Sequence, residues 1–272
     1  MVTSEAAGDT DPVHDQRGAG ELLREWRVRR GLSQLELSVR AGVSSRHISF
    51  VETGRTVPSP TMVLRLAEQL NIPLRERNRL LIAAGHAPAY RQRPLDDPDL
   101  AAALTAVRRI IDSHTPYPAL AVDHRWNLLF ANDAAEVFFA GVAPELLAQP
   151  INMMRLGLHP KGFAHRLRNL DRVRGFLLPR LARQAAQTGD ADLYSLHREL
   201  AAFGESGHAH IDAADIALPI ELEHRGAVLR LFNTITTFGA AFDVTLDDIA
   251  VEAYFPADPD TANHLRALAE PD

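Results

Sequence analysis

Apolar residues recur at the three- and four-residue spacing of amphipathic helices throughout residues 17–86. Glycines and serines mark where these helices stop and start, because Gly31 and Gly54 suit C-terminal caps and Ser33 with Glu36 forms a capping box. The pattern predicts an all-α unit of five short helices. They comprise a helix that ends before residue 31 and the approximate segments 34–40, 44–53, 61–70 and 74–85.

A tight turn, Ala41-Gly42-Val43, separates the second and third predicted helices, as in a helix-turn-helix. The small residues fit this corner because two helices that cross steeply leave little room there. The third helix would turn its apolar positions toward the core. Four residues are then left on an outer face that could enter a DNA major groove: Ser45, Arg46, Ser49 and Phe50.

Beyond residue 99 the helical spacing gives way to short apolar strands separated by polar turns. The predicted strands are 119–123, 126–131, 216–224, 227–238 and 249–257. Helices are predicted at 100–111, after a cap at Asn132 or Asp133, and at 162–187. Two strands, a helical middle and three closing strands predict an α+β, PAS-like domain, with an antiparallel sheet covered by helices on one face.

Three prolines and charges of both signs between residues 86 and 99 indicate a boundary between these two units. The predicted organisation begins with a disordered acidic tail (1–16) and a helix-turn-helix domain (17–86). A linker (87–99) and a PAS-like ligand-binding and dimerisation domain (100–272) follow.

Charge is distributed unevenly along the chain, whose formal net charge is -6. Residues 17–93 contain 14 arginines and six glutamates, a balance of +8, whereas residues 1–16 carry -4 and residues 94–272 carry -10. A basic block joined to an acidic one is typical of a nucleic-acid-binding module fused to another domain, although a solvated face would give the same count.

The composition and motifs of the chain exclude several kinds of chemistry and location. The chain has no cysteine, which excludes disulfides, thiolate metal sites and thiol nucleophiles. No apolar run reaches the ~18–20 residues that cross a bilayer, and the acidic N-terminus is unlike a secretory signal, so we expect a cytoplasmic protein without a membrane partner. His208, His210 and Asp212 could share one side of an extended segment, but no catalytic motif accompanies them. We interpret them as part of a polar loop and expect no enzymatic activity, metal or cofactor.

The segment LSQLELSVRAGVSSRHISFVETGRTVPS resembles the phage-repressor (XRE/Cro) helix-turn-helix family. Its Leu-Ser-Gln start, Ala-Gly-Val-Ser turn, Ile-Ser core, Glu-x-Gly-Arg exit and Pro-Ser restart follow the family order, and the resemblance covers about residues 20–85. It implies sequence-specific binding to double-stranded DNA, usually as a homodimer on a palindromic operator. Use of the fold as a protein-interaction module is the alternative.

The resemblance also implies roles for single residues. Bases would be contacted from the outer face of the third helix by Ser45, Arg46, Ser49 and Phe50. Arg46 could bind O6 and N7 of a guanine, and Phe50 could contact a thymine methyl group. The DNA backbone would be contacted by Arg27, Gln34, Ser44, Arg55 and Thr56. For Arg27, an ion pair with Glu52 is the alternative.

Leu35 and Val39 depart from the family pattern, because many relatives carry charged residues at these positions of the second helix. Four residues apart on a helix, they would form a small apolar stripe on its surface. We interpret this stripe as packing against the second domain or a partner subunit, with harmless exposure as the alternative.

The second domain resembles the ligand-binding domain of MmyB-like transcription regulators over roughly residues 100–265. The resemblance rests on the linker APAYRQRPLDDP, the strand pair PYPALAVDHRWNLLFAN and the ending FNTITTFG with DVTLDDIAVEAYFPAD. It implies a small-molecule sensor with an apolar, fatty-acid-like ligand. A domain that binds a protein partner, as in an antitoxin-like regulator, is the alternative.

An apolar ligand would need large apolar side chains between the sheet and the helices. The candidates for this pocket are Phe130, Phe138, Met153, Phe163, Phe176 and Leu177, each of which could equally be part of the core. A ligand carboxylate could be met by Arg174, Arg180, His197 or Arg198, and the sequence does not choose among them.

Overall fold

The computed structural model describes residues 17–204 and 219–270, which form two compact units divided between Ala89 and Tyr90. The predicted acidic tail and the segment with His208, His210 and Asp212 lie outside the described residues. Among the helices that are described, none has the length and apolar character needed to span a membrane.

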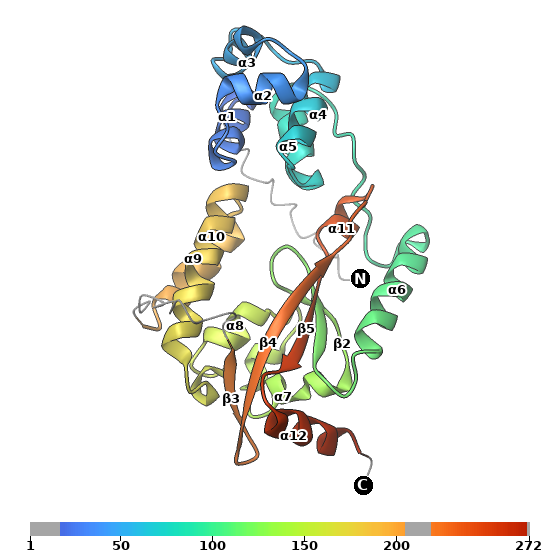
Figure 1. Cartoon of the computed structure of the whole chain (residues 1–272), viewed down its shortest axis with the longest axis vertical. Coiled ribbons are helices and arrows are strands. Elements are labelled where there is room, and N and C mark those ends of the chain that lie inside the picture. The colour runs from blue at the N-terminus through green and yellow to red at the C-terminus, as the bar shows by residue number, and fades with distance from the viewer. Residues whose placement is uncertain (1–16, 205–218, 271–272) are drawn as a thin grey trace, which may run out of the picture. The chain divides into compact units, whose positions relative to one another are not determined.

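Five helices make up the first unit, as the apolar spacing predicts (Figure 1). Three of them begin at predicted serine caps: the hydroxyl oxygens of Ser33, Ser44 and Ser59 each accept a hydrogen bond from the backbone N–H three residues later. Glu36 completes the predicted capping box with Ser33. The helices are α1 (Ala19–Arg29), α2 (Gln34–Ala41), α3 (Ser45–Glu52), α4 (Pro60–Gln69) and α5 (Leu74–Ala83).

Two glycines allow α1, α2 and α3 to pack closely in this unit. Gly42 ends α2 with φ of 64°, a left-handed conformation that costs glycine little. A Cβ atom at Gly20 would lie only 2.2 Å from the carbonyl oxygen of Val51, so a larger residue would push α1 away from α3. The resulting core contains large apolar residues from all five helices, including Leu23, Leu37, Ile48, Leu66 and Leu81.

The second unit contains a five-stranded antiparallel sheet in the order β2-β1-β5-β4-β3. All five strands lie close to their predicted positions. They are β1 (Ala119–Val122), β2 (Leu128–Ala131), β3 (Ile220–His224), β4 (Ala227–Thr237) and β5 (Ala250–Pro256). The α+β class of this domain is therefore confirmed.

Helices cover both faces of this sheet, and the expectation that they would cover one face is wrong. On one face, α6 (Ala101–Asp112) packs with Ala119 and Ala121 of β1. The other face, which includes Leu120, packs with the remaining helices (Figure 1). These are α7 (Glu136–Phe139), α8 (Met153–Leu158), α9 (Leu170–Thr188), α10 (Ala191–Ala201) and α12 (Pro259–Ala269). The physical reason is that β1 is apolar at every position, as expected for a strand buried on both sides.

The end of the predicted linker belongs structurally to the second unit. The Val244 N–H at the start of α11 (Val244–Asp247) donates to the Arg91 carbonyl oxygen at 2.8 Å. The Arg93 guanidinium also pairs with the buried Asp243 at 2.7 Å. Asn132, expected as a cap, instead ties three segments together, because its buried amide bonds to backbone atoms of Ile111, Tyr117 and Ala119.

Candidate DNA-binding surface and ligand cavity

The outer face of α3 carries the residues that were predicted to contact bases. Ser45 and Arg46 are exposed in the first turn, and Ser49 and Phe50 follow half-buried one turn later. Ile48, on the opposite side, is 1% exposed and fixes the helix to the core. The structure thus brings the four predicted residues together on one surface.

Two arginines flank Phe50 on this face. The guanidinium carbons of Arg46 and Arg55 lie 5.2 and 5.7 Å from the centre of the Phe50 ring, within the range of a cation–π interaction. Neither guanidinium pairs with a carboxylate within the described residues. Thr56 lies next to them, and its N–H donates to the Phe50 carbonyl oxygen at 3.2 Å. The face is therefore positively charged, with two exposed arginines beside the half-buried Phe50 ring.

Arg27 does not belong to this surface, and its predicted contact with the DNA backbone is contradicted by its geometry. Its guanidinium is buried and forms a two-point ion pair with Glu52, at 2.6 and 2.9 Å. The remaining nitrogen donates to the Leu32 carbonyl oxygen at 2.7 Å. The hydrogen bond that Arg27 donates to Glu52 raises the pKa of Arg27 above its ordinary value. Arg27 points inward because it lies four residues after the buried Leu23, on the same face of α1.

Gln34 and Ser44, the other predicted backbone contacts, are held at the first turns of α2 and α3. The Gln34 side-chain amide donates one N–H to Glu52 at 2.8 Å. Its second N–H can donate to another acceptor. The Ser44 hydroxyl oxygen accepts from the His47 N–H at 3.2 Å, so this side chain serves first as a helix cap. Leu35 and Val39 remain 65% and 75% exposed and take no part in the core of the first unit.

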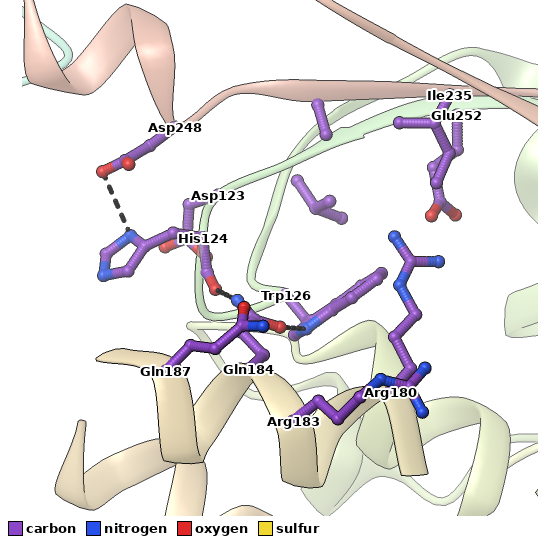
Figure 2. A pocket seen from close by; sticks show the side chains of 12 residues that line it. Asp123, His124, Trp126, Arg180, Arg183, Gln184, Gln187, Ile235, Asp248 and Glu252 are labelled. Atoms are coloured by element: carbon purple, nitrogen blue, oxygen red, sulfur yellow. Dashed lines mark hydrogen bonds and ion pairs between the residues drawn. The ribbon is translucent and has the colours of Figure 1, made fainter. Parts of the chain in front are cut away.

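The second unit contains a cavity of about 330 Å³ on the α9 face of the sheet (Figure 2). Its walls come from the β1–β2 turn, from α9, from β4 and β5, and from the end of α11. It is lined by Val122, Asp123, His124, Trp126, Arg180, Arg183, Gln184, Gln187, Ile235, Asp248, Ala250 and Glu252. Five of these 12 residues are Asp, Glu or Arg, so the lining is mixed and not apolar.

Trp126 forms one wall because of the unusual turn in which it lies. Its φ is 68°, a conformation that is rare for a bulky residue. The Asp123 side chain stabilises this turn by accepting from the N–H groups of Arg125 and Asn127 at 2.8 and 2.9 Å. The Trp126 indole N–H then donates to the Gln184 side chain at 2.8 Å, which orients the ring (Figure 2).

Glu252 lies in the cavity wall with only 5% of its surface exposed. The Tyr254 hydroxyl donates to its carboxylate at 2.7 Å. Burial raises the pKa of Glu252, and the hydrogen bond from Tyr254 and the positive charge of Arg180 only partly oppose this effect. Burial and the neighbouring Glu252 raise the pKa of Tyr254 well above its ordinary value.

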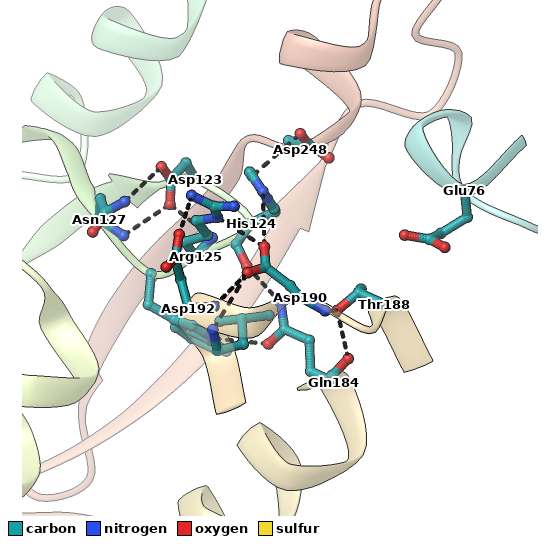
Figure 3. A network of polar contacts seen from close by, with 12 residues as sticks. Glu76, Asp123, His124, Arg125, Asn127, Gln184, Thr188, Asp190, Asp192 and Asp248 are labelled. Atoms are coloured by element: carbon teal, nitrogen blue, oxygen red, sulfur yellow. Dashed lines mark hydrogen bonds and ion pairs between the residues drawn. The ribbon is translucent and has the colours of Figure 1, made fainter. Parts of the chain in front are cut away.

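A polar network joins the rim of the cavity to the α9–α10 corner (Figure 3). His124 lies between Asp248 and Asp190, with nitrogen to oxygen distances of 3.3 and 3.9 Å. Arg125 pairs with Asp190 at 2.8 Å and with Asp192 at 2.6 Å. These contacts hold the β1–β2 turn against α9 and so fix the width of the cavity. The described residues contain no cluster of three or more metal-ligating side chains.

None of the six residues predicted for an apolar pocket lines this cavity. Phe138, Met153 and Phe163 are buried in the core on the α9 face, and the half-buried Leu177 packs against them. Phe130 lies on the α6 face, where the Arg108 guanidinium stacks on its ring at 3.9 Å. Phe176 is 46% exposed.

The four basic candidates for a ligand carboxylate are also separated. Arg180 lines the cavity, whereas Arg174 is buried against the carbonyl oxygens of Leu158, Leu200 and Gly204. His197 is half-buried and Arg198 is exposed on α10.

Sequence reasoning missed Trp126, whose position depends on a left-handed turn that the motif HRWN does not reveal.

The arrangement of a helix-turn-helix before a PAS-like α+β domain defines a transcription regulator with a ligand-binding domain. Residues 23–77 match the helix-turn-helix family, and residues 103–268 match the MmyB-like transcription regulator ligand binding domain. The second match covers more than half of the chain. The chain therefore belongs to the MmyB-like family, as the sequence motifs predict.

Two relatives match part of the chain. RghRB of Bacillus subtilis strain 168, an uncharacterized HTH-type transcriptional regulator, is 40% identical over 72 residues, which are 26% of this chain and 50% of that protein. The HTH-type transcriptional repressor RghR of the same strain is 46% identical over 55 residues, 20% of this chain and 41% of that protein. The chain thus spans at most half the length of these relatives.

A structural comparison gives weaker similarity. The structure of an RNA-binding light-oxygen-voltage receptor aligns with 93% of this chain and 64% of its own, at 14% identity and a TM-score of 0.26. We conclude nothing about function from this value.

Proposed function

We propose that the protein binds a specific DNA operator through the outer face of α3 and that its second unit senses a small molecule. In this proposal it is a binding protein without enzymatic activity. The observation that carries the DNA part is the cluster of Arg46, Phe50 and Arg55, in which two exposed arginines flank a half-buried ring on and directly after the second helix of a helix-turn-helix. Arginine is the side chain that most often recognises guanine in the major groove.

We also propose that the protein acts as a homodimer on a palindromic operator, because one helix-turn-helix covers only a half-site. Leu35 and Val39 form an exposed apolar stripe on α2 that would suit a contact with a partner subunit or with the second unit. A sensed ligand would then change DNA affinity only if it bound one dimer geometry better than another. Molar mass by light scattering, with and without an operator duplex, tests the dimer.

The mixed lining of the cavity favours a ligand with a polar group over a wholly apolar one. A fatty-acid chain gains its binding energy from contact with apolar surface. Here Asp123, His124 and Asp248 are among the residues of the wall. The fatty-acid-like ligand that the family resemblance implies would therefore need a different cavity or a rearranged one.

Selection from a pool of random double-stranded DNA, followed by sequencing, tests the DNA-binding proposal. The wild type should enrich one sequence motif, and the double variant Arg46→Ala, Phe50→Ala should enrich none. As a matched control, Arg65→Ala removes an exposed arginine of α4 and should leave the motif unchanged. If the wild type enriches no motif while it retains its fold, the proposal of operator binding is wrong.

A further inference from the structure

Within the described residues, the acidic side chains around the cavity in the second unit have bonding partners, and the arginines do not. Its acidic side chains have partners: Asp123 accepts hydrogen bonds within its own turn, Asp248 pairs with His124, and Glu252 accepts from Tyr254. Each of these carboxylates therefore already has a partner within the protein.

The two arginines of the cavity lack such partners. Arg180 and Arg183 project from the same side of α9, three residues apart, with Arg180 half-buried and Arg183 exposed at the rim (Figure 2). Within residues 17–204 and 219–270, neither guanidinium makes a hydrogen bond or an ion pair. Arg180 faces Glu252 without forming an ion pair with it (Figure 2). The unsatisfied charge of the cavity is therefore positive.

A flat apolar surface lies beside these charges. The Arg180 guanidinium lies 4.6 Å from the centre of the Trp126 ring, and the bond to Gln184 holds that ring in place. Val122, Ala250 and Ile235 extend the apolar part of the wall. Aromatic rings and arginine guanidinium groups both stack favourably on planar groups. A volume of about 330 Å³ is small for a ligand site and suits a compact molecule.

We propose that this cavity binds a compact aromatic carboxylate. Its carboxylate contacts Arg180 and Arg183, and its ring stacks beside Trp126. A hydroxyl or N–H group on the ring has Glu252 as its acceptor. A planar carboxylate matches a guanidinium in shape as well as in charge, whereas a long alkyl chain would meet the polar side of the wall. The inference deepens the proposed ligand-sensing function and rests on it.

Isothermal titration calorimetry on the full chain without DNA tests this inference. The probes are benzoate, 4-hydroxybenzoate and indole-3-carboxylate, with methyl 4-hydroxybenzoate as the uncharged match and octanoate as the alkyl carboxylate. We expect at least one ring carboxylate to bind. The uncharged ester should bind at least about tenfold more weakly because it cannot form the charged hydrogen bonds to the arginines. Octanoate should also bind at least about tenfold more weakly because its alkyl chain would meet the polar side of the wall.

Two variants and one control connect the binding to the arginines. Arg180→Gln and Arg183→Gln should each weaken the ring carboxylate at least about tenfold. Because Arg180 also stacks on Trp126, Arg183→Gln is the variant that removes charge without disturbing the indole. Arg198→Gln removes an exposed arginine of α10 outside the cavity and should change nothing.

Three results would overturn the inference: no binding of any of the three ring carboxylates, equal binding of the ester, or unchanged affinity in both cavity variants. Tighter binding of octanoate than of every ring acid would also overturn it. Because these titrations contain no DNA and the operator selection contains no ligand, failure of this inference would leave the operator result intact.

Discussion

The guanidinium of Arg27 on α1 and the carboxylate of Glu52 on α3 form a buried two-point ion pair, at 2.6 and 2.9 Å. Gln34 of α2 donates to the same carboxylate at 2.8 Å. The first three helices thus converge on one acid, which sets the angle at which α3 presents Arg46 and Phe50. The pair shapes the DNA-binding surface without being part of it.

Breaking this pair should destabilise the first unit strongly. Arg27→Ala leaves the buried Glu52 carboxylate without its counterion, and loss of one partner of a buried pair costs about 3–5 kcal/mol. Hydrogen exchange of peptides from α1 and α3 measures the effect in the full chain. Arg24→Ala, an exposed change on the same helix, should stay within ~0.5 kcal/mol of the wild type. Equal protection in the two variants would mean that the pair adds nothing.

The helices of the first unit could be predicted from the sequence because most of their boundaries are encoded locally by a serine cap or a glycine stop. Contacts between residues that are distant in the sequence were harder to predict. The buried position of Arg27 is nonetheless visible in retrospect, since it lies four residues after Leu23 on the apolar stripe of α1. The family resemblance favoured a contact between Arg27 and DNA, and its burial contradicts that role.

In the second unit, strand positions followed from short apolar runs, but the side of the sheet that each residue faces did not. Phe130 pairs with Ala121, whose side chain faces α6, and this register separates it from the other candidate pocket residues. The unbroken apolar run of β1 could have revealed helices on both faces. The cavity could not be predicted, because it depends on Trp126, Gln184 and Glu252 meeting across more than 100 residues of chain.

Arg46→Ala should weaken binding to the selected operator by about 1–3 kcal/mol and relax the preference at one base pair. The reason is that an exposed guanidinium without a carboxylate partner is free to bind a guanine. Fluorescence anisotropy with the operator and with a scrambled duplex measures both effects. An equal loss on the two duplexes would show that Arg46 reads no base.

Arg55→Ala should weaken binding to both duplexes to a similar degree. Arg55 follows α3, and its guanidinium lies near the same Phe50 ring as that of Arg46. From this position Arg55 can contact a phosphate while Arg46 enters the groove. Loss of one phosphate contact should lower the slope of log affinity against log salt by about 1. A change in the preferred sequence with an unchanged slope would contradict this backbone role.

His224 of β3 and His264 of α12 meet with ring nitrogens 3.2 Å apart, and His224 is buried. Burial lowers the pKa of His224, and the nearby positive charges of His264, Arg225 and Arg166 lower it further. The unfolded chain therefore binds more protons than the folded one below about pH 6.5, the ordinary pKa of histidine. Stability should fall as pH drops through this value and should stop falling below the pKa of the folded state.

Thermal unfolding at pH 7.5, 6.5 and 5.5 measures this dependence through the midpoint temperature. The wild type should lose more stability on acidification than His224→Gln, which replaces the titrating ring with a neutral amide. His165→Gln removes an exposed histidine of the same unit and should behave as the wild type does. If the midpoint temperature falls equally with pH in all three proteins, the acid sensitivity lies elsewhere. If it falls less in His224→Gln alone, the acid sensitivity belongs to the contact between β3 and α12.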